Sequence, residues 1–221
     1  MTATTSDANE LARHAMVVSQ LRTSAVNDPR VVEAMASVPR EDFVGEENRA
    51  TAYRDRELPL GGGRQQNTPL ATGLLLVQAD VQPTESVLLI GAAGGYTAAL
   101  LSRLGGRVVA VESDATLAGA ARVALAPNGN VELVEGPLAQ GAAEAGPFDV
   151  LVIDGAVGEL PDTLVRQVRP GGRVVAGLVE GGVARLAAGV RGEGVVLVPF
   201  SDIESIVLPG FERPRAFHFP G

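Results

Sequence analysis

A glycine-rich turn between an apolar run and a helix-like run is the segment of this chain best suited to bind a ligand. Val87–Ile90 is apolar, Gly91-Ala92-Ala93-Gly94-Gly95 follows, and Tyr96 resumes an apolar pattern at helical spacing. A second apolar run ends at Glu112, about 20 residues beyond the turn, the spacing at which parallel α/β folds place a carboxylate that accepts hydrogen bonds from ribose hydroxyls. Such turns also bring backbone N–H groups to a ligand. The sequence therefore predicts a site for an adenosine-type cofactor, with Glu112 as the ribose partner.

Three interpretations of the turn stay open on its spacing alone. A dinucleotide fingerprint needs glycine at positions one, three and six, where this chain has Gly91, Ala93 and Tyr96. Two of the three fail, so a nicotinamide-dependent oxidoreductase is the weakest hypothesis. An S-adenosylmethionine loop takes glycine at positions one, three and five, and here only the methyl group of Ala93 departs from it, because Gly95 is in place. The third interpretation is a close strand-to-helix turn that binds nothing.

The composition restricts the chemistry that the chain can perform. The 221 residues include 18 basic and 26 acidic side chains, for a net charge of −8, and no cysteine. This charge argues against nucleic acid as a main partner, because neutralisation of phosphates supplies most of such affinity. All the basic residues are arginine, which excludes a lysine Schiff base and a P-loop lysine. His14 and His218 are too few for a histidine metal cluster, so no metal site is expected. No apolar run has the length of a membrane span and no signal-peptide pattern opens the sequence, so we expect a cytoplasmic protein.

Strand and helix patterns alternate from Thr84 onward and predict a doubly wound, mostly parallel sheet. The expected strands are Val87–Ile90, Val108–Glu112, Val131–Val134, Asp149–Asp154 and Arg173–Leu178, and the expected helices are Tyr96–Leu104, Ala115–Leu125 and Pro161–Val168. After Gly181 three shorter runs are expected to extend one edge of the sheet, at least one of them antiparallel. These runs are Val183–Val190, Val195–Pro199 and Ala216–Phe219.

The first eighty residues have a different pattern and are expected to form a helical cap on the sheet. An amphipathic helix is predicted over Asp7–Leu21, with Asp7 and Glu10 as a capping box and Leu11, Ala15, Val18 and Leu21 on its apolar face. Further helices are expected from Pro29 to just before Val38-Pro39 and from Thr68-Pro69 to about Gln78, with an irregular stretch, Asp42–Thr68, between them. We therefore divide the chain into a helical and loop segment, 1–80, and a nucleotide-binding domain, 81–221.

With these segments in place, the chain resembles the protein-L-isoaspartate O-methyltransferase family from about Met16 to about Gly177. The resemblance rests on Val38-Pro39-Arg40-Glu41-Asp42-Phe43-Val44, Ala52-Tyr53-Arg54-Asp55, Leu58-Pro59-Leu60-Gly61, Val87–Ala99, Pro147-Phe148-Asp149 and Gln167–Val174. The first of these segments is the most specific, because it lies outside the nucleotide-binding fold; its plain alternative is a turn that packs Phe43 into the core. The closing segments, Leu208–Arg213 and Phe217-His218-Phe219, resemble a divergent bacterial branch of the family.

The resemblance implies a seven-stranded methyltransferase fold with S-adenosylmethionine as methyl donor. It also implies a reaction, the esterification of the free carboxylate of an isoaspartyl residue in a damaged protein. Such a carboxylate has an intrinsic pKa of about 4 and is already ionised at neutral pH, so it needs no general base. Catalysis can then consist of placing an oxygen in line with the methyl group and excluding water. The expected partner is accordingly a protein or peptide carboxylate.

Several positions depart from the pattern of the family. Asn67 stands where the family has a functional serine near the methyl transfer, and Leu89 replaces an acidic residue that helps to hold the cofactor. Gly136-Pro137-Leu138 replaces Gly-Asp-Gly, whose aspartate lies beside the adenine. Asp154 replaces a threonine after the fourth strand, facing the expected cleft. It is expected to bind the ammonium group of the cofactor, to repel a carboxylate substrate, or to cap the turn before Gly155.

The expected site therefore has Asn67 on the acceptor side. The expected cofactor-binding residues are Gly91, Ala93, Gly95, Glu112, Leu138 and Asp154. The leading hypothesis is an S-adenosylmethionine-dependent methyltransferase whose acceptor is uncertain. The alternative is a catalytically inactive family member that keeps the fold for binding or regulation, with cofactor binding weakened or lost, because the departures at Asn67, Leu89 and Pro137 occur together.

Overall fold

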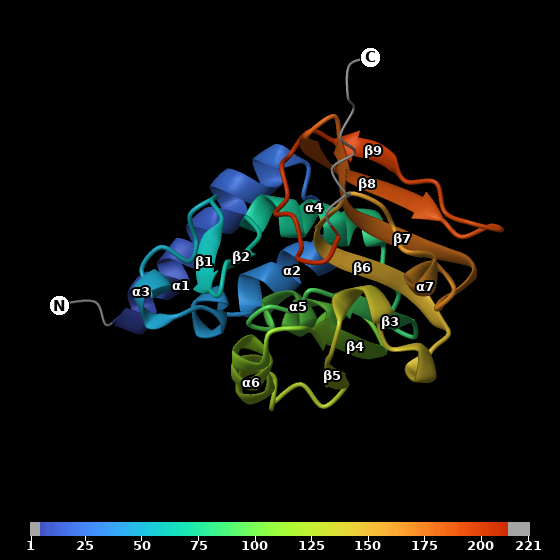
Figure 1. Cartoon of the computed structure of the whole chain (residues 1–221). Coiled ribbons are helices and arrows are strands. Elements are labelled where there is room, and N and C mark those ends of the chain that lie inside the picture. Colours follow the sequence, from blue (N-terminus) through green and yellow to red (C-terminus); the bar gives the residue numbers. More distant parts are fainter. Residues whose placement is uncertain (1–4, 212–221) are drawn as a thin grey trace, which may run out of the picture.

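The computed structural model describes residues 5–211 and contains a seven-stranded sheet with helices on both sides (Figure 1). In spatial order the strands are β5 (Val131–Glu135), β4 (Arg107–Glu112), β3 (Ser86–Ile90), β6 (Phe148–Val157), β7 (Val168–Glu180), β8 (Val183–Val190) and β9 (Val198–Ser201). The pairs from β5 to β7 are parallel, whereas β8 is antiparallel to β7 and β9 to β8. The predicted fold class, a mostly parallel seven-stranded sheet, is confirmed. The strand expected at Ala216–Phe219 lies outside the described residues.

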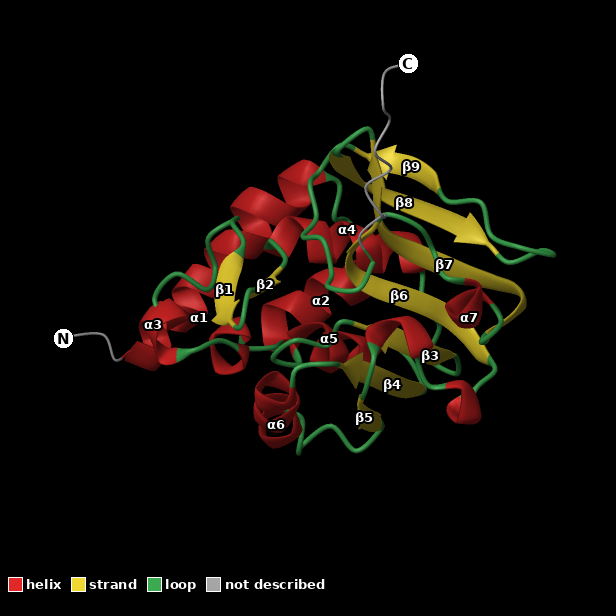
Figure 2. Ribbon diagram, viewed as in Figure 1, coloured by secondary structure: helices red, strands yellow, loops and turns green. Residues whose placement is uncertain are grey.

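The thicker layer on this sheet is formed by the N-terminal helices together with α4, α5 and α6 (Figure 2). Its elements are α1 (Thr5–Met16), the π-helical turn Val17–Leu21 with a 3-10 turn Arg22–Ser24, α2 (Pro29–Ser37), α4 (Pro69–Ala79), α5 (Tyr96–Leu104) and α6 (Ala115–Ala124). The side chain of Asp28 caps α2 and that of Thr68 caps α4, each by accepting a hydrogen bond from a backbone N–H of the first turn, as the Asx-Pro and Thr-Pro patterns predict. One buried cluster joins Met16 and Leu75 to Leu89, so the core continues across residue 80. The division of the chain at that residue stays a prediction.

The first helix differs from the prediction in its start and in its buried face. It begins at Thr5, before the Asp7 that was expected to cap it. Leu11 and Val18, both expected on the apolar face, have 71% and 47% of their surface exposed, whereas Met16 and Val17 are buried. The π-helical turn accounts for the exposure of Val18, because its wider spacing departs from a strict 3.6-residue period. Leu11 precedes this turn, and nothing in the structure explains its exposure.

The opposite face of the sheet has a much thinner cover. It consists of the single helical turn α7 (Asp162–Val165), the 3-10 turns Leu138–Gln140 and Ala143–Ala145, and the chain that follows β9. The helix predicted over Pro161–Val168 is shorter because β7 already begins at Val168. Leu208 and Phe211, from the chain after β9, are buried on this face with Leu138 and Leu164.

The stretch Asp42–Thr68 is more ordered than predicted. It continues from a 3-10 turn, Arg40–Phe43, into the short helix α3 (Glu46–Arg49) and a two-stranded hairpin, β1 (Leu58–Gly61) and β2 (Arg64–Gln66). The hairpin is a separate sheet that does not pair with the main one (Figure 1). Gly61, Gly62 and Gly63 all have positive φ, a conformation that costs glycine little and lets the chain reverse over this short distance. This hairpin brings Arg64 to the carboxyl end of β4.

Candidate functional site

The glycine-rich turn after β3 is held by β4. The N–H groups of Gly91 and Ala92 donate to the carbonyl oxygen of Val111, at 3.0 and 3.1 Å. The N–H of Ala93 donates to Glu112 Oε2 at 2.7 Å. Gly91 and Gly95 have φ of +82° and +99°, values that glycine adopts without strain, and Ala93 has φ of +50°. The sequence predicts that the N–H groups of this turn bind a ligand. Three consecutive ones instead donate hydrogen bonds to Val111 and Glu112 at the end of β4.

Glu112 is fully buried at that end of β4, and both of its carboxylate oxygens are occupied. Oε1 accepts from the N–H groups of Ser113 and Asp114, at 2.8 and 3.0 Å. Oε2 accepts from the N–H of Ala93 and from Arg64 Nη2, which is 2.8 Å away. Ser113 Oγ adds a long hydrogen bond to Oε1 at 3.5 Å. A carboxylate offers about four acceptor positions, so these donors saturate it.

Arg64 is a residue of this candidate site that sequence analysis missed. It is 5% exposed and forms a buried ion pair with Glu112, whereas its Nε and Nη1 atoms have no hydrogen-bond partner among the described residues. The sequence did contain a signal for it: Arg64 is a charged residue that directly follows three glycines and lies three positions before Asn67, the predicted acceptor-side residue. Its partner, however, is 48 residues further along the chain.

Asn67 and Asp154, predicted separately, are in direct contact. Asn67 Nδ2 donates to Asp154 Oδ1 at 2.7 Å, and Thr97 Oγ1 donates to Asp154 Oδ2 at 2.5 Å. Burial raises the pKa of Asp154, and these two hydrogen bonds oppose the rise only in part. Its hydrogen bonds come from side chains of other elements rather than from its own turn, so the alternative in which Asp154 caps the turn before Gly155 is wrong.

The chain after β9 closes over the carboxyl ends of β3 and β6. Asn67 Oδ1 accepts hydrogen bonds from Ser205 Oγ and the Ile206 N–H, both at 3.1 Å. The N–H of Ala156 donates to the carbonyl oxygen of Ile206, which continues this contact along β6. The Leu208 side chain then lies against Gly91, where an added Cβ would be 3.0 Å from Leu208 Cδ1. The predicted acceptor residue is therefore enclosed by a segment that no motif had marked.

The Val38–Val44 run supports the glycine-rich turn from the other side. A Cβ atom at Gly94 would collide with the carbonyl oxygen of Phe43, and the Phe43 ring lies 5.8 Å from the ring of Tyr96. Arg40 is fully buried, with its guanidinium carbon 4.8 Å from the Tyr96 ring centre, and it donates to the carbonyl oxygen of Asn67 at 2.5 Å. The Val38–Val44 run therefore positions both the glycine-rich turn and Asn67. These contacts give a structural reason why this particular sequence is needed here.

The two remaining positions of interest contribute packing. Leu89 is fully buried on β3, in the cluster under the N-terminal helices. Leu138, predicted to bind the cofactor, is 3% exposed and belongs to the cluster on the opposite face with Leu208 and Phe211. A cofactor contact at Leu138 stays a prediction.

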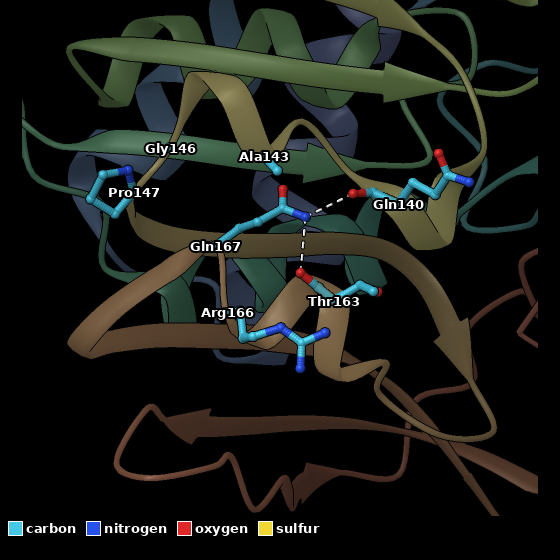
Figure 3. Close-up of a pocket in the computed structure, with 7 residues that line it drawn as sticks. All are labelled: Gln140, Ala143, Gly146, Pro147, Thr163, Arg166 and Gln167. Atoms are coloured by element: carbon cyan, nitrogen blue, oxygen red, sulfur yellow. Dashed lines mark hydrogen bonds between the residues drawn. The ribbon is translucent and has the colours of Figure 1, made fainter.

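A separate cavity of about 500 Å³ lies at the other end of the sheet (Figure 3). It is lined by Gln140, Ala143, Gly146, Pro147, Thr163, Arg166 and Gln167. Figure 3 shows the Gln167 amide donating to the carbonyl oxygens of Gln140 and Thr163, at 2.7 and 2.9 Å. The cavity adjoins the starts of β6 and β7, whereas ligands of open parallel sheets bind at the carboxyl ends of strands. It is therefore distinct from the site around Glu112.

Comparison with known sequences decides the lineage. The sequence model of the protein-L-isoaspartate(D-aspartate) O-methyltransferase family matches residues 12–194. The chain belongs to this family. A protein-L-isoaspartate O-methyltransferase of Koribacter versatilis is 38% identical over 167 residues, which cover 75% of each chain. Membership confirms the resemblance and the main functional interpretation, a methyltransferase of the isoaspartyl family.

Solved structures agree with the fold. A protein-L-isoaspartate O-methyltransferase superposes with a TM-score of 0.78 at 24% identity, over 90% of this chain and 66% of the other. A protein described as a member of this family from Plasmodium falciparum, in complex with S-adenosyl-L-homocysteine, superposes with a TM-score of 0.75 at 17% identity, over 89% of this chain and 98% of the other. At these identities the likeness establishes the fold. Within residues 5–211, every helix is too short or too polar to span a membrane.

Proposed function

We propose that the chain is an S-adenosylmethionine-dependent O-methyltransferase that esterifies the carboxylate of isoaspartyl residues in proteins. The observation that carries the proposal is Glu112, a fully buried carboxylate at the carboxyl end of β4 that touches the glycine-rich turn, in a chain that belongs to this family. A buried carboxylate at that position is the acceptor that a ribose diol requires.

The residue types at this site are suited to binding S-adenosylmethionine. Gly91 and Gly95 leave the turn without side chains, and Glu112 supplies the acceptor. The Nη1 atom of Arg40 and two nitrogens of Arg64 are buried without a partner among the described residues, so the site holds more donors than the described residues satisfy. Bound S-adenosylmethionine supplies a methyl group activated by a sulfonium. Gly91, Gly95 and Glu112 would hold it, with Asp154 as the acceptor for its ammonium group.

The side chains around Asn67 favour a carboxylate as the methyl acceptor. Arg40 donates to the carbonyl oxygen of Asn67, and the charges of Arg40 and Arg64 both act on Asp154, which is hydrogen-bonded to Asn67. Guanidinium groups bind carboxylates in a defined geometry and would hold an acceptor that is already ionised.

Asn67 is the residue that we assign to positioning the acceptor. Its amide is fixed from both ends, since Nδ2 donates to Asp154 and Oδ1 accepts from Ser205 and Ile206. A rigid amide at this place can orient an oxygen without taking a proton from it. The enclosing segment 205–208 would keep water from the reacting atoms.

Two synthetic peptides that differ only at one residue test the proposed reaction. The first contains an isoaspartyl residue and the second the ordinary aspartyl isomer, and methyl transfer is followed with labelled S-adenosylmethionine. We expect methylation of the first peptide and none of the second. Binding of S-adenosylhomocysteine without methylation of either peptide would contradict the acceptor and leave a methyltransferase of other specificity.

Calorimetric titration with S-adenosylhomocysteine tests the cofactor separately. We expect saturable binding to the full chain. Absence of binding at millimolar concentration would overturn the proposal and favour the second candidate, a family member that keeps the fold for binding or regulation. The observation behind that candidate is the presence of Arg64 and Leu208 against Glu112 and Gly91.

A further inference from the structure

Arg64 stands at the carboxylate that a cofactor would use. Five groups donate to the oxygens of Glu112: three backbone N–H groups of the β4 end and the adjoining turn, Arg64 Nη2 at 2.8 Å, and Ser113 Oγ at the long distance of 3.5 Å. A ribose diol that donates to Glu112 must replace one of them. The backbone groups of the β4 end and of the turn cannot leave without breaking the fold, and the Ser113 hydroxyl is at the distance limit of a hydrogen bond, so Arg64 is the strong donor that can be exchanged.

The attachment of Arg64 is suited to exchange. Its guanidinium is held through Nη2 alone, since Nε and Nη1 have no partner among the described residues. The residue lies on β2, which among the described residues forms a ladder with β1 alone, and the turn between the two strands is Gly62-Gly63, both with positive φ. A short hairpin outside the main sheet can shift without disturbing the hydrogen bonds of β3 and β4.

We propose that Arg64 is an internal competitor of the cofactor, which occupies Glu112 and must withdraw when an adenosine-type ligand donates its ribose hydroxyls to that carboxylate. The proposal rests on the proposed function in one respect, the role of Glu112 as ribose acceptor. Because the pair is buried, the ligand has to break a charge-assisted hydrogen bond before it makes its own. Arg64 therefore lowers the affinity of the chain for its cofactor.

Calorimetric titration of Arg64→Gln with S-adenosylhomocysteine measures this effect. Glutamine keeps a hydrogen-bond donor and removes the charge, so we expect S-adenosylhomocysteine to bind about ten-fold or more tightly than to the wild-type chain. Arg107→Gln is the matched control, because Arg107 also pairs with a glutamate, Glu132, at 2.8 Å, but at the start of β4 and with 48% of its side chain exposed. Its affinity should equal that of the wild-type chain.

The outcomes separate this inference from the proposed function. Binding to both chains with equal or weaker affinity for Arg64→Gln would overturn the competition and leave the proposed function intact. Absence of binding to either chain would overturn both. Binding to Arg64→Gln alone would support the competition and overturn the proposed function of the wild-type chain, because the competitor would then reduce its affinity below detection.

Hydrogen exchange on the wild-type chain provides a test that does not depend on the folding of a variant. On addition of S-adenosylhomocysteine, the amides of β1 and β2 should exchange faster, because the hairpin loses its attachment through Arg64, and those of residues 91–95 should exchange more slowly. Slower exchange in both regions would contradict withdrawal of Arg64, because it would mean that the hairpin tightens around the ligand.

Discussion

Glu112 and Asp154 are two buried carboxylates at the carboxyl ends of β4 and β6, with β3 between them, yet they are held in different ways. Glu112 accepts hydrogen bonds from the charged Arg64, from three backbone N–H groups and, at 3.5 Å, from the Ser113 hydroxyl. Asp154 accepts hydrogen bonds from the neutral side chains of Asn67 and Thr97, while Arg40 and Arg64 act on it through their charge, and burial raises its pKa overall. Glu112 is therefore held by a charge-assisted hydrogen bond, whereas Asp154 is not, and the raised pKa means that Asp154 ionises at a higher pH than an exposed aspartate does. Position at a strand end is thus not enough to assign a role to a carboxylate.

The largest effect should come from removing the charged partner of Arg64. Glu112→Ala leaves a guanidinium buried without its counterion, and breaking a buried pair in this way costs about 3–5 kcal/mol of unfolding free energy. Urea unfolding measures the loss. The control is Glu132→Ala, which breaks the exposed pair with Arg107 and should cost about 1 kcal/mol or less. Similar losses in the two variants would show that the Glu112 pair behaves like a surface contact and would remove the contrast with Asp154.

A smaller effect, dependent on pH, should come from Asp154→Asn. The raised pKa means that the folded chain binds the proton more tightly than the unfolded chain, so ionisation of Asp154 lowers stability as the pH rises from the ordinary value of 3.8 to the raised one. The asparagine variant lacks this loss. Its stability relative to the wild-type chain should therefore increase with pH across this window and stay constant above it, as measured by urea unfolding at a series of pH values.

Asp149→Asn is the matched control, because Asp149 lies at the start of the same strand and has the opposite shift. Burial would raise its pKa, but hydrogen bonds from Arg169 and Ser86 lower it overall. Ionisation of Asp149 therefore stabilises the folded chain, and this contribution is lost as the pH falls below 3.8 through the lowered value. The stability of this variant relative to wild type should decrease as the pH rises. The same pH trend in both variants would contradict the distinction between the two ends of β6.

The smallest effect should come from Ala93→Gly. Ala93 has φ of +50°, where a side chain costs about 1–2 kcal/mol, while glycine costs about 0.5–1 kcal/mol in chain entropy. The unfolding free energy should accordingly rise by about 1 kcal/mol or less, because the N–H that donates to Glu112 is retained. A clear loss of stability in a thermal melt would show that the methyl group, which is almost fully buried, contributes more by packing than it costs in strain.

The regular elements could be predicted because their signals are local. The predicted helix Tyr96–Leu104 and strand Val183–Val190 match the structure residue for residue. Glycines flank the helix at both ends and precede the strand, and the apolar pattern runs through each element. The β1–β2 hairpin escaped prediction because its strands are short and its turn is a run of glycines, a composition that also describes an irregular loop. The π-helical turn after Met16 gave no periodic signal of its own.

Most residues of the candidate site could be predicted from the sequence, but most of the contacts between them could not. Gly91, Glu112, Asn67 and Asp154 follow from strand ends and from family position, and the last two indeed touch. The pairing of Arg64 with Glu112 and the closure by residues 205–208 depend on tertiary contacts that no local pattern encodes. Ala93 illustrates the limit of prediction from sequence. The sequence shows only that a methyl group replaces the expected glycine, whereas the structure shows that the backbone N–H of Ala93 donates to Glu112.

The contact between Asn67 and Ser205 has a consequence for the order of folding. It joins residues 138 positions apart, whereas neighbouring parallel strands close much shorter stretches of chain. Contacts between distant residues carry the largest loop-closure entropy and tend to form late. A refolding chain should therefore assemble its central strands first and gain the enclosure of Asn67 afterwards, so the last event of folding and the completion of the proposed site would coincide in time.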